Sequence, residues 1–182
     1  MRRLPRIALV GVLAMPGAVG AVEPPPTSRE TASCDVVLNV IDPDPNGTNV
    51  RAAPNLGGKI LTVLAPGDEA ITAHVVAQRG DWMRIDRAHI TDETQADGLR
   101  RLFEGDGWIH ARLLGIASLF VGGGTALRAR PDAESPVVFR LDRDDTRPTR
   151  LLGCSGRFVR VRYGETVGWT DRWCANERTT CN

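Results

Sequence analysis

Cys154 is the residue best suited by type to act as a nucleophile, in the segment Gly-Cys-Ser-Gly-Arg-Phe at 153–158. Such chemistry needs a thiolate that is paired with a histidine, commonly at the start of a helix. The three histidines, His74, His89 and His110, all precede it in the chain, and Cys154 itself falls between two expected strands. We therefore interpret Cys154 as a structural cysteine.

A second pattern copies part of a calcium-binding loop. The segment 42–47 reads Asp-Pro-Asp-Pro-Asn-Gly and matches the first half of the D-x-D-x-N-G loop that coordinates calcium. The twelfth loop position, which should carry a bidentate carboxylate, is Ala53, and Pro43 and Pro45 resist the required backbone. We interpret the segment as a proline-stiffened turn between two strands and expect no metal.

Other catalytic patterns are missing from the sequence, which has no paired-carboxylate motif, G-x-S-x-G, H-E-x-x-H or phosphate-binding loop. The glycine runs at 57–58 and 122–124 lack the lysine and the helix that a phosphate site requires. We therefore expect a protein that is not an enzyme and that holds no cofactor.

The four cysteines, Cys34, Cys154, Cys174 and Cys181, contain no C-x-x-C pair and have no suitably spaced histidine for a zinc site. Two disulfides are the expected outcome, with three connectivities open. Since three of the four lie in the second half of the chain, Cys34 must pair with one of them if all are bonded. Each bond would add roughly 2–4 kcal/mol of stability, and the bond made by Cys34 would hold the two halves together.

The N-terminus has the order of a secretory signal peptide. Arg2, Arg3 and Arg6 precede an apolar run at 7–15, and small residues follow up to a predicted cleavage after Ala21. The run is too short to span a bilayer, which needs roughly 20 residues, so a membrane anchor is the less favoured alternative. We expect a secreted, periplasmic protein, because export also explains why an even number of cysteines would form disulfides.

The composition narrows the class of protein further. The chain has 182 residues, 42% of them apolar and 25% charged, which excludes a collagen-like, disordered or membrane-embedded protein. Removing residues 1–21 would leave 20 basic against 22 acidic residues, so the exported chain is mildly acidic. That balance argues against a nucleic-acid partner.

The sequence contains an internal repeat. Residues 49–64 align with 126–141, the segment GDWMRI at 80–85 aligns with GRFVRV at 156–161, and Gly107-Trp108 aligns with Gly168-Trp169. The first copy carries 15 extra residues between Ile85 and Gly107. The identical pairs are Arg51/Arg128, Ala52/Ala129, Pro54/Pro131 and Leu64/Leu141.

Both copies are predicted to be β-structure. Short runs of β-branched residues, with turn signals between them, favour two small β-barrels in tandem, an all-β fold. Within the insertion at 86–106, Leu99, Leu102 and Phe103 have helical spacing, so we expect a short helical turn there, although Gly98 disfavours it.

Each copy resembles a bacterial SH3 (SH3b) domain, through Asn-Val-Arg-Ala-Ala-Pro at 49–54, GDWMRI at 80–85 and Gly-Trp-Ile at 107–109. The second copy departs from the pattern at Leu127, Asp144 and Phe158. The predicted organisation is a signal peptide at 1–21, a Pro-rich leader at 22–34, a first domain at 35–114, a second domain at 115–174 and a tail at 175–182.

The resemblance implies where a ligand would bind. Trp82 and Phe158 occupy equivalent positions that we expect in the core, whereas Trp108 and Trp169 would lie at the barrel edge where SH3-like folds hold ligands. The alternative interpretation is that all of these aromatic rings belong to the core or to its hydrophobic rim and bind no ligand. The full set of candidate ligand-binding residues is Trp108, Trp169, Trp173, Tyr163, Arg128 and Arg172, with Arg160 as a further flanking cation.

Three functions remain open from the sequence. The leading one is an exported, non-catalytic binding module of the cell envelope that recognises a peptide, peptidoglycan or an envelope protein. The second is an inhibitor or immunity protein whose insertion at 86–106 plugs an envelope hydrolase. The third is a thiol peptidase: the Cys154 segment superficially resembles that of papain-like cell-wall peptidases, but their catalytic histidine lies downstream of the cysteine.

Overall fold

The computed structural model describes residues 31–119, 122, 124–142 and 149–175, and within them it is built of β-strands with one short 3₁₀ turn. The predicted all-β class is therefore confirmed. The predicted signal peptide, residues 22–30 of the leader, Cys181 and residues 176–182 lie outside the described residues. The elements are β1 (Thr31–Val40), β2 (Thr48–Arg51), β3 (Ile60–Leu64), β4 (Thr72–Arg79), β5 (Trp82–Thr91), β6 (Leu99–His110), η1 (Ala111–Leu113), β7 (Leu114–Gly115), β8 (Thr125–Arg128), β9 (Val137–Leu141), β10 (Thr149–Ser155), β11 (Phe158–Tyr163) and β12 (Thr166–Thr170).

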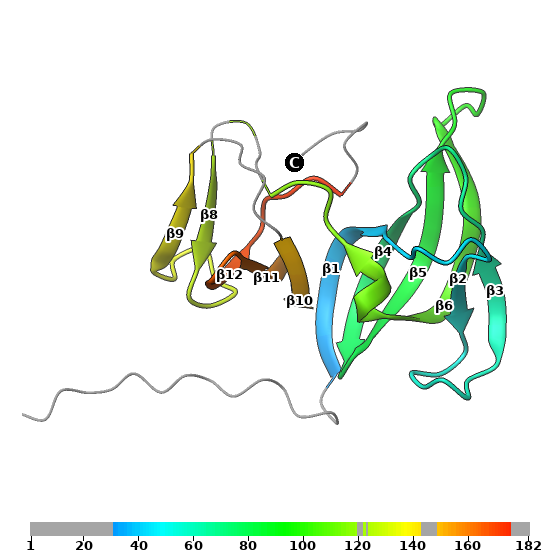
Figure 1. Ribbon diagram of the computed structural model, residues 1–182, viewed down its shortest axis with the longest axis horizontal. Helices are drawn as coiled ribbons and strands as arrows, with labels where there is room; N and C mark the ends of the chain where they lie inside the picture. The colour runs from blue at the N-terminus through cyan, green and yellow to red at the C-terminus, as the bar shows by residue number, and fades with distance from the viewer. Residues whose placement is uncertain (1–30, 120–121, 123, 143–148, 176–182) are drawn as a thin grey trace, which may run out of the picture.

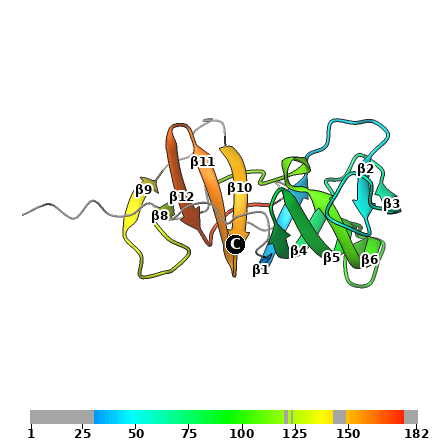
Figure 2. The same ribbon diagram turned by 90° about the horizontal axis from the view of Figure 1, so that it is seen from below.

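The strands form two sheets that lie side by side (Figures 1 and 2). The first sheet has seven strands in the order β3-β2-β6-β5-β4-β1-β7 and curls on itself, and the second has five in the order β10-β11-β12-β8-β9. No helix in the described part of the chain is long and apolar enough to cross a membrane.

The two sheets share one strand order. Strands β2 to β6 run β3-β2-β6-β5-β4, and β8 to β12 run β9-β8-β12-β11-β10, which is the same order for the aligned strands. The register agrees as well, because Arg51 pairs with Trp108 in the first sheet and Arg128 pairs with Trp169 in the second. We call β2–β6 the first repeat and β8–β12 the second repeat.

A glycine begins each repeat for the same steric reason. Gly47 and Gly124 adopt φ values of +89° and +92°, which side chains rarely tolerate. At Gly124 a Cβ would also lie 2.8 Å from the carbonyl oxygen of Leu141, and at Gly47 it would collide with the equivalent carbonyl of Leu64. Because each glycine lacks a side chain, the start of β2 can lie close to the end of β3, and the start of β8 close to the end of β9.

The insertion at 86–106 is a β-hairpin, so the expectation of a helical turn is wrong. It extends β5 and β6, which pair antiparallel out to Thr91 and Leu99, and its tip turns at Gly98 with φ +71°. Register shifts within this pairing allow the adjacent Leu102 and Phe103 both to pack against the core. Continued pairing also satisfies the backbone polar groups, which outweighs a three-residue helical spacing.

Strand β1 begins within the segment expected to be a leader. It starts at Thr31, four residues before the predicted domain boundary, and pairs antiparallel with β4 from Thr31 opposite Arg79 to Asn39 opposite Thr72. Its alternating side chains Cys34, Val36 and Leu38 are buried in the core. This strand has no counterpart in the second repeat, where β10 is an edge of the sheet.

Candidate functional site

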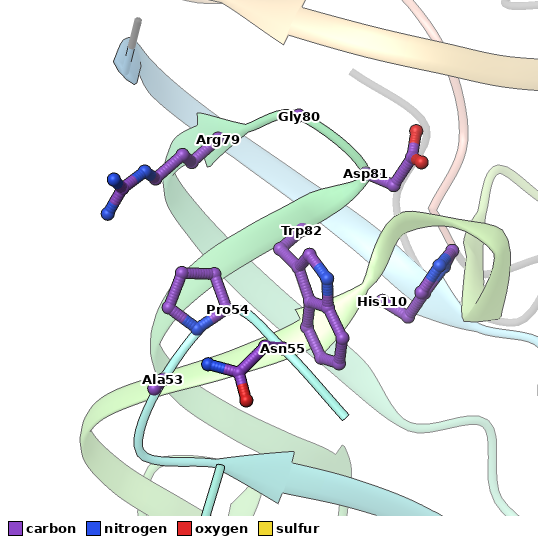
Figure 3. A pocket seen from close by; sticks show the side chains of 8 residues that line it. All are labelled: Ala53, Pro54, Asn55, Arg79, Gly80, Asp81, Trp82 and His110. Carbon is purple, nitrogen blue, oxygen red and sulfur yellow. The ribbon is translucent and has the colours of Figure 1, made fainter. Parts of the chain in front are cut away.

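A hollow with a volume of about 590 Å³ lies on the first repeat (Figure 3). Three segments form it: the loop between β2 and β3, the turn between β4 and β5, and the end of β6. Its lining residues are Ala53, Pro54, Asn55, Arg79, Gly80, Asp81, Trp82 and His110.

Backbone hydrogen bonds hold the β2–β3 wall of the hollow. Asn55 N donates to Ala53 O at 2.8 Å, and Gly58 N donates to Asn55 O at 3.1 Å. The Arg51 guanidinium reaches across the loop and donates to the Gly58 carbonyl at 2.9 Å. The loop therefore has a defined shape, and Pro54 presents its ring to the hollow with a fixed φ.

Trp82 is the main aromatic surface of the hollow, so the expectation that it belongs to the core is wrong. It is half-buried, and its ring meets the His110 ring edge-on, with centroids 5.2 Å apart and planes at 62°. His110 Nδ1 accepts a hydrogen bond from Arg112 N at 3.3 Å, which orients the imidazole beside the indole. Trp82 begins β5 directly after the turn, so its side chain stands at the sheet end, where fewer neighbours cover it.

Charges of both signs stand at the rim. Arg79 and Asp81 flank Gly80 in the β4–β5 turn, and both are exposed. Gly80 has φ +57°, so the turn requires a residue tolerant of the left-handed region. An aromatic ring with a guanidinium and a carboxylate nearby is suited to holding a peptide through stacking and charged hydrogen bonds.

The equivalent turn in the second repeat is bonded to β1. Its turn is Ser155-Gly156-Arg157, and Gly156 exchanges hydrogen bonds with β1, donating to Ser33 O at 2.7 Å and accepting from Asp35 N at 2.8 Å. Phe158, which aligns with Trp82, is buried as expected. We call the first turn open because it borders the hollow, and the second turn structural because it is hydrogen-bonded to β1.

The two candidate tryptophans lie in separate sheets, each between two arginines. Trp108 is paired with Arg51 and with Arg84 on its neighbouring strands. Trp169 is paired in the same way with Arg128 and with Arg160, whose guanidinium carbon lies 6.0 Å from the indole centroid. The structure thus brings Arg128 and Trp169 together, as the sequence suggested.

The remaining candidate ligand residues have structural contacts. Tyr163 is only 1% exposed and packs against Phe139. Trp173 donates from its indole nitrogen to Val37 O at 2.9 Å, which ties the chain after β12 to β1. Arg172 donates to the carbonyls of Gly122 and Gly124 at 2.9 and 3.2 Å. Tyr163 therefore cannot meet a ligand without a rearrangement.

A disulfide joins Cys34 on β1 to Cys154 on β10. Cys34 is thus paired with a cysteine of the second half, as the count of cysteines required, and Cys154 has no free thiol. Cys174 is disulfide-bonded as well. Such bonds persist in an oxidising compartment.

The segment 42–47 forms a turn that is stabilised by its own side chains. Asp42 accepts hydrogen bonds from Asp44 N and from the Thr48 hydroxyl, at 3.1 and 2.9 Å. Asp44 accepts from the backbone and side-chain nitrogens of Asn46, and these bonds lower the pKa of its carboxyl. The carboxylates of Asp42 and Asp44 thus hold the turn between β1 and β2, and a turn at this place is what the sequence predicted.

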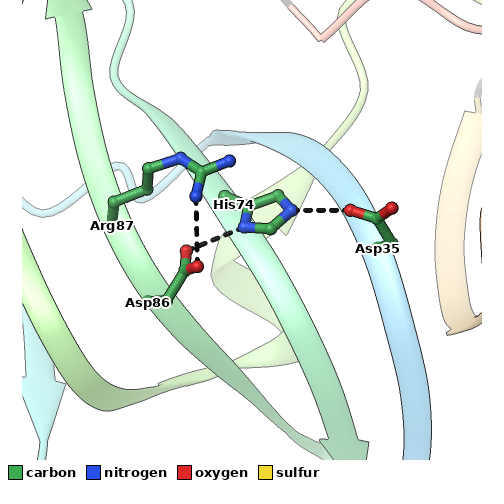
Figure 4. A network of polar contacts seen from close by, with 4 residues as sticks. All are labelled: Asp35, His74, Asp86 and Arg87. Atoms are coloured by element: carbon green, nitrogen blue, oxygen red, sulfur yellow. Dashed lines mark hydrogen bonds and ion pairs between the residues drawn. The ribbon is translucent and has the colours of Figure 1, made fainter.

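A histidine network on the first sheet was not foreseen from the sequence (Figure 4). His74 Nδ1 lies 2.7 Å from Asp86 Oδ1, and its Nε2 lies 2.8 Å from Asp35 Oδ1. Arg87 donates to the other oxygen of Asp86 at 3.1 Å. Asp35 lies on β1, His74 on β4 and Asp86 on β5. The spacing in the sequence does not reveal this network, because Asp35 and His74 are 39 residues apart.

No protein-family model, no curated protein and no solved structure matches this chain.

Proposed function

We propose that this chain is an exported, non-catalytic binding protein of the cell envelope that recognises a peptide, either free or as part of peptidoglycan, through SH3b-like domains. The observation that supports this most directly is the open hollow with Trp82 and His110 on its wall. Export is supported by the basic and apolar order of residues 1–21 and by the disulfide, which suits an oxidising compartment.

The hollow favours a short peptide over a larger rigid ligand. Trp82 offers a flat apolar surface, while Arg79 and Asp81 can meet a carboxylate and an amino group of the same ligand. Peptide stems that carry both charges therefore match this lining better than a neutral sugar chain does. The pre-formed loop at Ala53–Asn55 reduces the ordering cost of binding.

Co-sedimentation with purified peptidoglycan sacculi tests the proposal. We expect the wild-type chain to be retained in the pellet and Trp82→Ala to lose at least ten-fold in affinity. Leu56→Ala is the matched control, because Leu56 is 73% exposed and lies outside the hollow. Equal retention of both variants would show that the hollow is not the site.

The second candidate function is inhibition of an envelope hydrolase by the β5–β6 hairpin. Its tip is ordered, since the Asp92 carboxylate accepts from Thr94 N and Oγ1 at 3.0 and 2.6 Å and Asp92 N donates to Gly98 O at 2.8 Å. An ordered projection suits insertion into a cleft. In the co-sedimentation experiment, a hydrolase inhibitor would stay in the supernatant instead of the pellet. It would also slow the digestion of sacculi by a muramidase or peptidase.

A further inference from the structure

The outer face of the second sheet carries an unusual set of arginines. Cross-strand pairs place them on one face: Arg150 is opposite Arg162, Arg160 is opposite Trp169, and Trp169 is opposite Arg128. Residues two apart on a strand share a face, so Arg160 joins Arg162. On the same rule Arg128 shares a face with Ala126, which is paired with Arg140. The resulting arginine face consists of Arg128, Arg140, Arg150, Arg160 and Arg162 around Trp169.

These arginines form no ion pair within the described part of the chain, and the Arg128 guanidinium donates to the Ser135 carbonyl at 2.9 Å. Among the described residues, no carboxylate lies within 4.0 Å of any of the five guanidiniums, whereas Arg157, outside the face, is paired with Asp171. Arg140, Arg150 and Arg162 are also exposed. Asp142 and Asp171 lie in the same hollow as Arg128 and Arg140. Five arginines on one sheet face nevertheless give this part of the described structure a local positive potential, on a chain whose overall charge is close to zero.

The first repeat shows that this charge is not required by the fold. At the aligned positions it has Asp86 for Arg162, His74 for Arg150 and Val63 for Arg140. Asp86 and His74 bond to each other there. Arg84, which aligns with Arg160, has Asp106 at 3.7 Å. Arg51, which aligns with Arg128, is retained. At the five aligned positions the first repeat thus has two arginines, Arg51 and Arg84, where the second repeat has five.

The geometry suits a linear chain of carboxylates. Neighbouring strands are about 4.8 Å apart, so the row from Arg150 on β10 to Arg140 on β9 spans roughly 19 Å, which an extended peptide covers with about six residues. Guanidiniums bind carboxylates through paired hydrogen bonds. Trp169 lies half-buried beneath Arg160, so it does not project as a membrane-inserting side chain would.

We propose that the arginine face is a second binding surface, separate from the hollow of the first repeat, which receives an extended acidic segment of a protein partner. The ligand lies across β10, β11, β12, β8 and β9, with its carboxylates on the arginines and an apolar side chain near Trp169. Binding of this kind weakens steeply as the salt concentration rises.

Titration calorimetry of the full chain with acetyl-hexaglutamate-amide tests this surface, with acetyl-hexaglutamine-amide as the uncharged probe. We expect the acidic peptide to bind and the Arg140→Gln/Arg162→Gln variant to lose at least ten-fold in affinity. The matched control is Arg100→Gln/Arg101→Gln, which removes the same charge from the exposed β5–β6 hairpin of the first sheet and should change affinity less than two-fold. If the double variant does not fold, as judged by circular dichroism, Arg140→Gln alone at the sheet edge should still lose about three-fold.

Three outcomes would overturn the proposal. They are equal losses in the two double variants, binding of the glutamine peptide as tight as that of the glutamate peptide, and capture only by vesicles that contain phosphatidylglycerol. Trp82→Ala should leave hexaglutamate binding unchanged, so failure of the hollow and failure of the arginine face can be told apart.

Discussion

The turn at Gly80 and the turn at Gly156 occupy the same place in two repeats with one strand order, yet they have different surroundings. The first opens onto the hollow beside Trp82. The second is hydrogen-bonded to β1, and its aligned aromatic residue, Phe158, is buried. The hydrogen-bond partners of the second turn come from β1, a strand that belongs to neither copy of the repeat.

Strand β1 connects the two repeats. It lies in the first sheet beside β4 and also reaches β10 through the disulfide and through Gly156. Gln78 on β4 adds a further link, since its side-chain oxygen accepts from Cys154 N at 2.8 Å. Two repeats with one strand order can thus differ in their turns when an added strand forms hydrogen bonds with only one of them.

Among these predictions, loss of the disulfide between β1 and the second repeat should have the largest effect on stability. Cys34→Ala/Cys154→Ala opens a link that spans 120 residues of sequence and should cost about 4 kcal/mol of unfolding free energy, because the unfolded chain regains its freedom. Urea denaturation of the wild type and of the variant, both oxidised, measures it. A loss below about 1 kcal/mol would mean that hydrogen bonds hold β1 against the second repeat without the covalent bond.

The two aligned aromatic residues should differ strongly in their contribution to stability. Phe158→Ala should cost about 3–4 kcal/mol, since it empties a buried position, whereas Trp82→Ala should cost about 1–2 kcal/mol at its half-buried one. Thermal unfolding followed by circular dichroism compares them. Similar losses would contradict the distinction between an open and a structural turn.

The aligned glycines of β6 and β12 should behave alike. A Cβ on Gly107 would collide with Val50 Cγ1 and come within 2.8 Å of the Phe103 ring, and one on Gly168 would lie 2.7 Å from Leu127 Cβ. Each alanine substitution should cost roughly 2 kcal/mol by overpacking, with the larger loss at Gly168 because a Cβ cannot rotate away. Denaturant midpoints measure both, and Gly67→Ala, in open space, is the control.

A small pH effect should be confined to the first repeat. Burial, followed by the nearby Arg87 and Arg101, lowers the pKa of His89, whose Nε2 lies 3.0 Å from the Thr72 hydroxyl. In the unfolded chain His89 has a pKa near 6.5, so below that pH it binds more protons in the unfolded state than in the folded state. The free energy of unfolding is therefore highest above pH 6.5 and decreases as the pH falls below it.

Hydrogen-exchange protection factors, which correct for the intrinsic pH dependence of amide exchange, should therefore fall in β4–β6 below pH 6.5 and not in β10–β12. His89→Gln keeps a side chain that can hydrogen-bond but does not titrate, and it should remove this difference. An equal fall of the protection factors in both repeats would assign the effect to other groups.

Much of the strand content could be predicted because β-branched residues and turn signals are local. The alternation through 158–163 predicts β11, and the motif at 80–85 predicts the start of β5. The helical spacing of Leu99, Leu102 and Phe103 was misleading, since register shifts in a hairpin bring adjacent side chains into the core. Of the candidate site, the pairing of Arg128 with Trp169 was foreseen, but the exposure of Trp82 was not.

The sequence by itself determined that the chain is all-β, that its two halves repeat, and that Cys34 would bond to the second half if all cysteines paired. Tertiary structure alone decided which cysteine it meets, which turn stays open, and that five arginines share one face of the second sheet. The physical reason is range: periodicity and turn propensity act over a few residues, whereas β1 acts on a strand that lies 120 residues further along the chain.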